Sequence, residues 1–286
     1  MIVFRSKVYF AVFCLILVYR SASAAKELRD NKNVKNKDVK GFSTDENVSW
    51  IGRLNNLSKY LPNCHRYDKH LNSCLVEATE KVKPFLAKGI PELGLPAFEP
   101  FIIPEINLEQ GTSALNFKAK LKNTEIYGLT NYTFSKFDFD VPNLQFFCEC
   151  TINNLQLRGN YSVTGKILVA PIVGSGTFTA SVENCNATVY QKVKVEKRKG
   201  GLNFIVPTHT NSSINVSGPK ANLQGLFDNN SDLSKITNKV INDNVNELFE
   251  DLKPVLEKVL SDILEDLLFK AIEGQIPYDK LYPPIP

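Results

Sequence analysis

The chain has 286 residues, of which 43% are hydrophobic and 22% are charged, so it can bury a large apolar core. Its formal net charge is only +4, and no cluster of Lys and Arg lies on one periodic face, which argues against nucleic-acid binding. After the N-terminal segment, no stretch reaches the roughly 18 uninterrupted apolar residues that a membrane-spanning helix needs.

The N-terminus has the pattern of a cleaved signal peptide. Arg5 and Lys7 precede a short apolar run from Val8 to Val18, and the small residues Ala22-Ser23-Ala24 follow it. This run is too short to cross a bilayer core of about 30 Å as a helix. We therefore predict that residues 1–24 are a signal peptide and that the mature protein is secreted and extracellular.

The cysteines and glycosylation sequons fit that compartment. Cys14 lies in the signal segment, and the remaining cysteines belong to a chain in which oxidised pairs are expected. N-x-[ST] sequons begin at Asn47, Asn56, Asn131, Asn160, Asn186, Asn211, Asn215 and Asn229. Chance explains several of them in an Asn-rich chain, but together they predict a glycoprotein.

A polar segment leads into the folded part of the chain. Residues 25–55 are mostly polar, include many Lys, Asn and Asp residues and lack an apolar period, which is typical of a flexible lead-in. We expect residues 56–286 to form one domain. The stretch from Pro91 to Pro104 is punctuated by prolines and is predicted to be extended or turning.

The first predicted helix spans the region from Cys64 to Ile90. Apolar residues recur there at a spacing of three to four, as they do on one face of a helix. Asn72 or Ser73 is expected to cap its N-terminus, and Gly89 is expected to end it.

A long β region follows. Apolar and polar residues alternate from Leu115 to Leu121, from Phe137 to Val141 and from Leu155 to Val169. Alternation with a period of two gives each strand one dry face and one wet face. Asn160 falls on the wet face, as a glycosylated residue requires.

The next strand is predicted to change face part way along. Pro171 to Gly176 is predicted to be a turn. Beyond it, apolar residues occupy even positions from Phe178 to Val182 and odd positions from Cys185 onward. A β-bulge produces such a switch, so we predict a bulge near Glu183–Asn184.

The last third of the chain predicts one long helix. Apolar residues recur at helical spacing from about Leu233 to Glu273, which is about 60 Å of helix at 1.5 Å per residue. Pro254 is expected to kink it, and Gly274 to end it. Since a compact globule of this size has a diameter of only about 45 Å, either the molecule is elongated or the helix is broken.

These patterns permit two interiors. An apolar helix lying in a curved, one-faced antiparallel sheet can leave a long dry channel between helix and sheet. A fully packed core has the same periodicity, and periodicity alone favours it because protein interiors are normally filled.

Four separated segments resemble the takeout and juvenile hormone binding protein family of insects. The opening is Leu61-Pro62-Asn63-Cys64, then Leu71-Asn72-Ser73-Cys74-Leu75, then the run from Lys83 to Pro96. The segment from Leu157 to Leu168 resembles the family's central strand. Asn242 to Pro254 and Ile276 to Pro283 resemble its C-terminal signature, so the likeness covers most of residues 60–283.

The resemblance implies an α+β fold in which a long C-terminal helix is wrapped by a curved, elongated antiparallel β-sheet that encloses a hydrophobic tunnel. It also implies a carrier of a small hydrophobic ligand, such as a juvenile hormone-like terpenoid, a fatty acid or another lipid. It therefore favours the channel over the packed core. We expect a monomer with no cofactor, no metal and no nucleic-acid partner.

The apolar faces of the predicted strands and helix provide the candidate ligand contacts. We expect about half of these candidates to be ordinary core residues. The sheet candidates are Leu115, Phe117, Phe137, Phe139, Tyr161, Val163, Ile167 and Phe178, and the helix candidates are Leu248, Leu252, Leu256, Val259 and Ile263. Tyr161 has the only hydroxyl in this set, so it is the candidate polar contact.

The cysteines outside the signal segment divide into two groups. Cys64 and Cys74 match the positions of the family's N-terminal disulfide. A zinc site that also uses His65 and His70 is the rival interpretation, but the spacing fits no usual zinc pattern. The other three are Cys148, Cys150 and Cys185, so at least one of them stays unpaired within this group. A second disulfide between Cys150 and Cys185 is possible.

Two other functions compete with the carrier. A membrane-acting protein that transfers lipid or binds microbial lipids would need an exposed basic or apolar tip. A hydrolase of lipid esters would need a catalytic motif. Neither a G-x-S-x-G elbow nor an H-E-x-x-H zinc site occurs, and His209 follows Pro207 in a setting typical of a surface residue.

Overall fold

The computed structural model describes residues 51–52, 55, 57–111, 115–167, 170–198, 200–268 and 275–285. The predicted signal peptide and most of the predicted lead-in lie outside these residues. The described residues form a seven-stranded sheet in the order β1-β2-β4-β5-β6, with β3 paired to β4 and β7 paired to β5, and every pairing is antiparallel.

The strands are β1 (Phe101–Gly111), β2 (Leu115–Tyr127), β3 (Tyr132–Asp140), β4 (Gln145–Ile167), β5 (Ala170–Lys197), β6 (Asn203–Ser217) and β7 (Lys220–Leu223). The helices are α3 (Leu71–Leu86), α4 (Ser231–Asp243), α5 (Val245–Leu268) and α6 (Tyr278–Leu281), with short 3-10 turns η1 (Pro91–Leu93) and η2 (Phe227–Asn229). No helix in the described part of the chain is long and apolar enough to cross a membrane.

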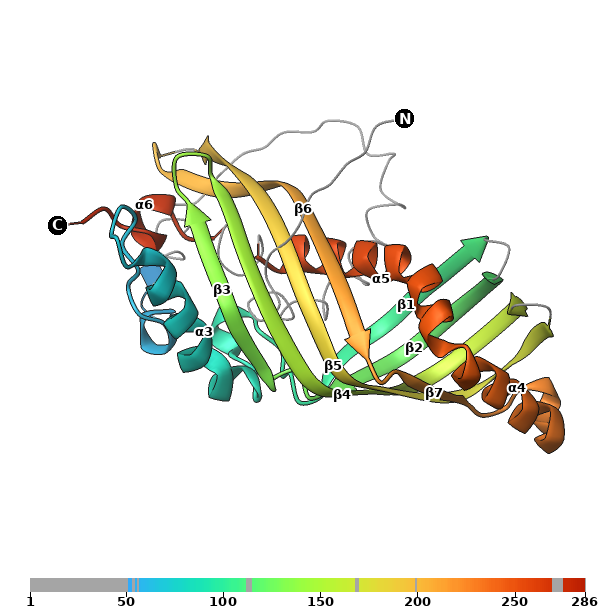
Figure 1. Cartoon of the computed structure of the whole chain (residues 1–286). Helices are drawn as coiled ribbons and strands as arrows, with labels where there is room; N and C mark the ends of the chain where they lie inside the picture. The colour runs from blue at the N-terminus through green and yellow to red at the C-terminus, as the bar shows by residue number, and fades with distance from the viewer. Residues whose placement is uncertain are drawn as a thin grey trace, which may run out of the picture.

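Strands β4 and β5 form the spine of the sheet. The first half of β4 pairs with β3, and its second half pairs with β2. In the same way, one half of β5 pairs with β6 and the other with β7. Figure 1 shows α3 and α6 beside one end of this spine, α4 beside the other, and α5 running between them. We call the two halves of the molecule the α3 end and the α4 end.

The predicted change of face lies where these two ends meet. Buried side chains of β4 occupy even positions up to Ile152 and odd positions from Leu155. β5 changes face at the same level, as predicted, but the register between the strands does not shift. One residue of each strand, Asn154 and Glu183, is left out of the pairing, and Asn154 has a φ of 56°. The change of face is therefore not the predicted bulge at Glu183–Asn184, because a bulge adds a residue to one strand and here each strand has one unpaired residue.

The predicted turn at Pro171–Gly176 is also wrong. This stretch belongs to β5 and pairs with residues 161–166 of β4. Its glycines instead allow a close approach of two backbones, since a Cβ at Gly176 would lie 2.1 Å from the carbonyl oxygen of Gln224.

Helix α3 is shorter than predicted, and its cap differs. His70 precedes its first residue without a side-chain cap, so the predicted cap at Asn72 or Ser73 is wrong. Asn72 instead bonds β3: its Nδ2 donates to Asp138 Oδ1 (3.0 Å), and its Oδ1 accepts from the Phe139 amide (3.0 Å). The expectation at Gly89 is confirmed, with a φ of 83° just beyond the helix.

The C-terminal helix is broken, but not at the proline. α5 continues through Pro254, whereas Asn244 separates α4 from α5. Asn244 leaves the helical conformation, and its Nδ2 donates to the carbonyl oxygen of Val240 (2.8 Å). Asn favours such helix ends because its short amide competes for backbone hydrogen bonds. The break lets α4 and α5 follow different edges of the sheet.

Candidate functional site

Two apolar clusters occupy the two ends of the molecule. At the α4 end, the buried members are Phe117, Tyr161, Ile172, Phe178, Leu226, Ile241 and Leu248. Val163, Ile167 and Leu252 pack against them while half-buried. Four of the predicted ligand contacts are thus buried core residues at this end, and three more line the same cluster. The side chain of Leu115 lies outside the described residues.

The α3 end holds the larger cluster. Phe137 and Phe139 of β3 are buried there with residues from α3, the first half of β4 and the second half of β5. The Phe139 ring stacks on that of Phe146, with centroids 4.1 Å apart. Leu264 of α5 is fully buried in this cluster. The predicted contact Ile263 is half-buried and packs against the cluster.

The centre of α5 lies between the two clusters. Leu252 belongs to the cluster at the α4 end, and Leu260 packs against the one at the α3 end. These residues are about 12 Å apart along the helix. The apolar residues Leu256 and Val259 lie between them and are only half-buried, and neither cluster of described residues includes them. The apolar stripe of α5 is therefore packed at both ends and incompletely packed in its middle.

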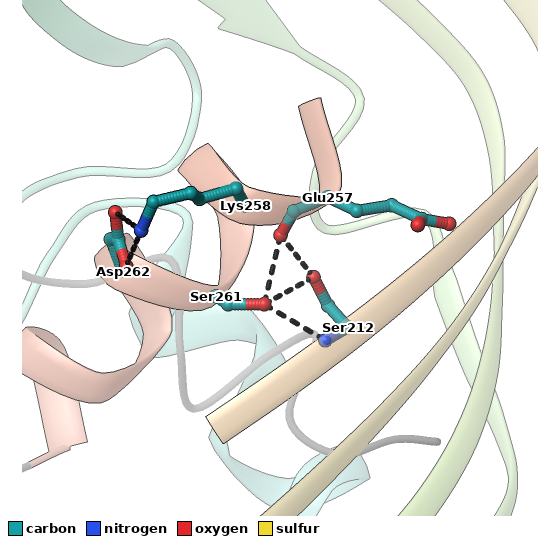
Figure 2. A network of polar contacts seen from close by, with 5 residues as sticks. All are labelled: Ser212, Glu257, Lys258, Ser261 and Asp262. Atoms are coloured by element: carbon teal, nitrogen blue, oxygen red, sulfur yellow. Dashed lines mark hydrogen bonds and ion pairs between the residues drawn. The ribbon is translucent and has the colours of Figure 1, made fainter. Parts of the chain in front are cut away.

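Polar side chains attach α5 to the free edge of β6, whose one strand partner among the described residues is β5. Ser261 Oγ accepts from the Ser212 amide (2.8 Å), and the two Ser hydroxyls are 2.9 Å apart. Both hydroxyls also donate to the Glu257 carbonyl oxygen, as Figure 2 shows. The Glu257 carboxylate accepts from the Ile214 amide (2.9 Å).

Helix α4 closes the edge of β7 in the same way. Asn238 accepts from the Leu223 amide (2.8 Å) and donates to the Leu223 carbonyl oxygen (2.8 Å). Asn242 makes the same pair of bonds with Ala221, at 3.0 and 2.7 Å. Helix residues four apart are about 6.0 Å apart along the axis, and strand residues two apart are about 6.6 Å apart, so an i, i+4 pair matches alternate strand residues. The helices therefore protect strand edges that would otherwise expose unpaired backbone groups.

The described cavities differ in character. A small, largely apolar cavity of about 60 Å³ lies at the α3 end, lined by Leu61, Leu75, Ala78, Phe137, Tyr282 and neighbouring residues. A wide groove of about 980 Å³ with a mixed polar and apolar lining lies at the α4 end, where Gln156, Arg158 and Thr179 contribute to its wall. These three residues are exposed and lie on the outer face, whereas Leu157 and Ala221, which also line the groove, pack against the inner cluster, so the groove is lined from both faces of the sheet.

Tyr161 is the predicted polar contact, and its hydroxyl is buried. Among the described residues, no partner forms a hydrogen bond with the Tyr161 hydroxyl. Burial raises the pKa of this group, because the phenolate form is poorly solvated in the cluster. A neutral hydroxyl in an apolar setting can donate to or accept from a ligand.

The first predicted disulfide is confirmed, and the second does not form. Cys64 is bonded to Cys74, which removes both thiols that the rival zinc interpretation needs. Cys150 and Cys185 are buried thiols. Cys150 lies opposite Ala187 and Cys185 opposite Ile152, so the two are diagonal neighbours. Diagonal neighbours have Cα atoms about 7–8 Å apart, beyond the usual range of a disulfide.

Most described sequon residues lie on the surface. Asn131, Asn160, Asn186 and Asn215 are exposed, and Asn211 is half-buried. Asn186 and Asn215 are direct cross-strand partners on β5 and β6. Asn47, Asn56 and the side chain of Asn229 lie outside the described part. Glycosylation of these residues stays a prediction.

Comparison with known proteins gives a consistent match. A family model described as haemolymph juvenile hormone binding protein (JHBP) matches residues 46–283. The circadian clock-controlled protein daywake of Drosophila yakuba is 27% identical over 198 residues, which are 66% of this chain and 76% of that protein. Daywake of Drosophila melanogaster is 25% identical over 201 residues, again 66% of this chain and 76% of that protein.

The fold is also that of a solved structure. The crystal structure of Takeout 1 from Epiphyas postvittana has a TM-score of 0.65 at 18% identity, over 78% of this chain and 99% of that one. This likeness confirms the expected α+β architecture, with C-terminal helices on a long antiparallel sheet. Since the matched family model covers most of the chain, the protein belongs to the haemolymph juvenile hormone binding protein family.

Proposed function

We propose that this protein is a secreted carrier of one elongated hydrophobic molecule, held between the apolar stripe of α5 and the inner face of the sheet. Its family consists of carriers of small hydrophobic molecules that are found in haemolymph. We call the ligand path proposed beneath the centre of α5 the proposed channel. A terpenoid, a fatty acid or another lipid chain fits the chemistry of its walls.

The incompletely packed centre of α5 is the observation that carries this proposal. Leu256 and Val259 keep accessible apolar surface between two clusters that are themselves buried. A ligand chain that covered this surface would gain about 25 cal/mol for each Å² removed from water. A chain of about 15 carbons gives roughly 12 kcal/mol gross, and association costs of about 4–6 kcal/mol leave about 6–8 kcal/mol, which is a Kd of roughly 1–40 µM.

Tyr161 is proposed to contact a polar group of the ligand at the α4 end. Its buried hydroxyl without a hydrogen-bond partner among the described residues supports this role. Replacing Tyr161 by Phe removes the hydroxyl and keeps the ring. We expect the Tyr161→Phe variant to bind an oxygenated terpenoid about three- to tenfold more weakly, as loss of one hydrogen bond would cause. Unchanged affinity would exclude the role.

Lipid extraction from the protein purified from its own source tests the function directly. Mass spectrometry of the extract should find one class of elongated hydrophobic molecule at a stoichiometry near one. The Leu256→Asp variant should lose that molecule, because a charge in the proposed channel would have to be desolvated. The exposed Lys258→Asp substitution on the same helix is the matched control. An empty wild-type protein that also takes up no fluorescent fatty acid would contradict the proposal.

A further inference from the structure

A second polar site lies inside the molecule, at the α3 end. Gln191 of β5 is completely buried, and within the described residues neither its Oε1 nor its Nε2 has a hydrogen-bond partner. The Oγ1 of Thr210 on β6 is also buried, and it too has no hydrogen-bond partner among the described residues. Gln191 and Thr210 are direct cross-strand partners. Buried amides without partners are rare because burying them is costly.

The register places these two side chains on the inner face. Gln191 has the same parity as the buried residues Ala187 and Val189 on β5. Thr210 has the same parity as Ser212, which bonds α5. A row of cross-strand neighbours runs across four strands through Phe139, Phe146, Gln191 and Thr210. Directly opposed Cβ atoms in such a row are about 4.5–5.5 Å apart.

This row adjoins both the proposed channel and the small apolar cavity. Thr210 is two residues, about 7 Å, from Ser212, which lies under α5. On the other side, the Tyr282 ring lies 5.0 Å from the Phe139 ring and 6.0 Å from the Phe146 ring. Tyr282 also lines the cavity of about 60 Å³.

The surroundings of Gln191 select an uncharged partner. Phe139, Phe146 and Thr210 in its row are neutral, as are Val189 and Val193 at the nearest inner-face positions of β5. Among these described residues an anionic group would meet no counter-charge, and burying a charge without one is strongly unfavourable. A hydroxyl can donate to Oε1 and accept from Nε2, so it satisfies both amide atoms. An ether oxygen can only accept, and a hydrocarbon can do neither.

We propose that Gln191 and Thr210 form the binding site for the uncharged hydroxyl end of an elongated hydrophobic ligand, whose apolar chain extends from there into the space beneath α5. This inference rests on the proposed carrier function and adds the class of ligand, an aliphatic or terpenoid alcohol. The buried amide then has its hydrogen bonds only in the loaded protein.

Matched ligands test the site. Dodecanol, its methyl ether and dodecane are titrated against the full mature protein in competition with a fluorescent anilinonaphthalene sulfonate probe. Wild type should bind dodecanol about tenfold more tightly than the ether, since the hydroxyl satisfies one more amide atom. In Gln191→Met, which keeps the side-chain size, dodecanol should keep at most about a threefold preference over the ether, from Thr210, while dodecane binds as in wild type. The exposed Gln156→Met substitution is the control and should keep the tenfold preference.

Further measurements keep the result decisive. Ligand-free Gln191→Met should melt at or above the temperature of the wild type, because it removes an unpaired buried amide. Thr210→Val should reduce the preference for the alcohol about threefold. This variant tests the site independently if Gln191→Met does not fold. Dodecane binding without a preference for dodecanol in wild type overturns the inference alone. Failure of all three ligands to bind wild type overturns the carrier function as well.

Discussion

The attachment of α5 to β6 gives a quantitative prediction for Ser261→Ala. Ser261 Oγ accepts from the buried Ser212 amide (2.8 Å), and its hydroxyl donates to the carbonyl oxygen of Glu257 (2.8 Å). The two serines are only 7% and 1% exposed, so water cannot replace the lost partner without opening the interface. Ser212 Oγ keeps its own bond to the Glu257 carbonyl oxygen (2.7 Å).

The expected magnitude follows from the unpaired amide. Leaving a buried N–H group without an acceptor costs about 1–3 kcal/mol. Replacing Ser by Ala inside a helix returns up to about 0.5 kcal/mol through helix propensity. The net destabilisation is then about 2 kcal/mol. For a domain of this size, that corresponds to a fall in Tm of about 4–8 °C.

Thermal unfolding followed by circular dichroism measures this change, and hydrogen exchange locates it. The Ser212 amide should lose protection in Ser261→Ala, because α5 no longer covers it. Ser175→Ala, at an exposed position of β5, is the control and should melt within about 1 °C of wild type. If Ser261→Ala melts with the control and the Ser212 amide stays protected, the edge of β6 is not held by this helix.

Three further predictions follow from the same structure. Asn238→Ala removes two hydrogen bonds to the β7 edge and should cost about 2 kcal/mol in urea unfolding, whereas the exposed Asn246→Ala should cost less than about 0.5 kcal/mol. Reduction of the Cys64–Cys74 bond, which closes a loop with a sequence separation of 10, should lower the free energy of unfolding by about 3 kcal/mol, and equal unfolding curves with and without reductant would contradict this. Burial raises the pKa of Cys185 from 9.0 to about 11. The neutral thiol therefore contributes to the free energy of unfolding in full below about pH 9, and this contribution should fall by about 2–3 kcal/mol as the pH rises to about 11. The Cys185→Ala variant should show a shallower loss of stability over that pH range, and an unchanged slope would rule the thiol out.

Local patterns predicted most elements of the fold, and the errors have identifiable causes. Period-two alternation located β2, β3 and β4, and helical spacing located α3 and the C-terminal helical region. The prediction for Pro171–Gly176 is wrong because Gly also permits close backbone approach within a strand, and Pro is tolerated near the start of one. Asn72 bonds a strand rather than the helix N-terminus, since an amide satisfies whichever backbone group lies nearest.

The candidate site was only partly predictable, for a related reason. Apolar periodicity indicates which face of an element turns inward, but the same side chains line a core or a channel. Phe117 and Phe178 are fully packed, whereas Leu256 and Val259 are not, and that difference arises from contacts between elements. The sequence does not single out Gln191, because one polar residue in a strand has no periodic signature.

The sequence by itself determined the strand and helix periodicity, the N-terminal cysteine pair and the family, because these depend on residue type and spacing. Only the tertiary structure decided where the helix breaks, which side chains close the sheet edges and which buried polar groups lack partners. Each of these depends on which residues from distant parts of the chain meet, and spacing along one chain does not specify such meetings. The register of β5 with β4 and β6 brings Phe146, Gln191 and Thr210 into one row, and no local pattern contains that row.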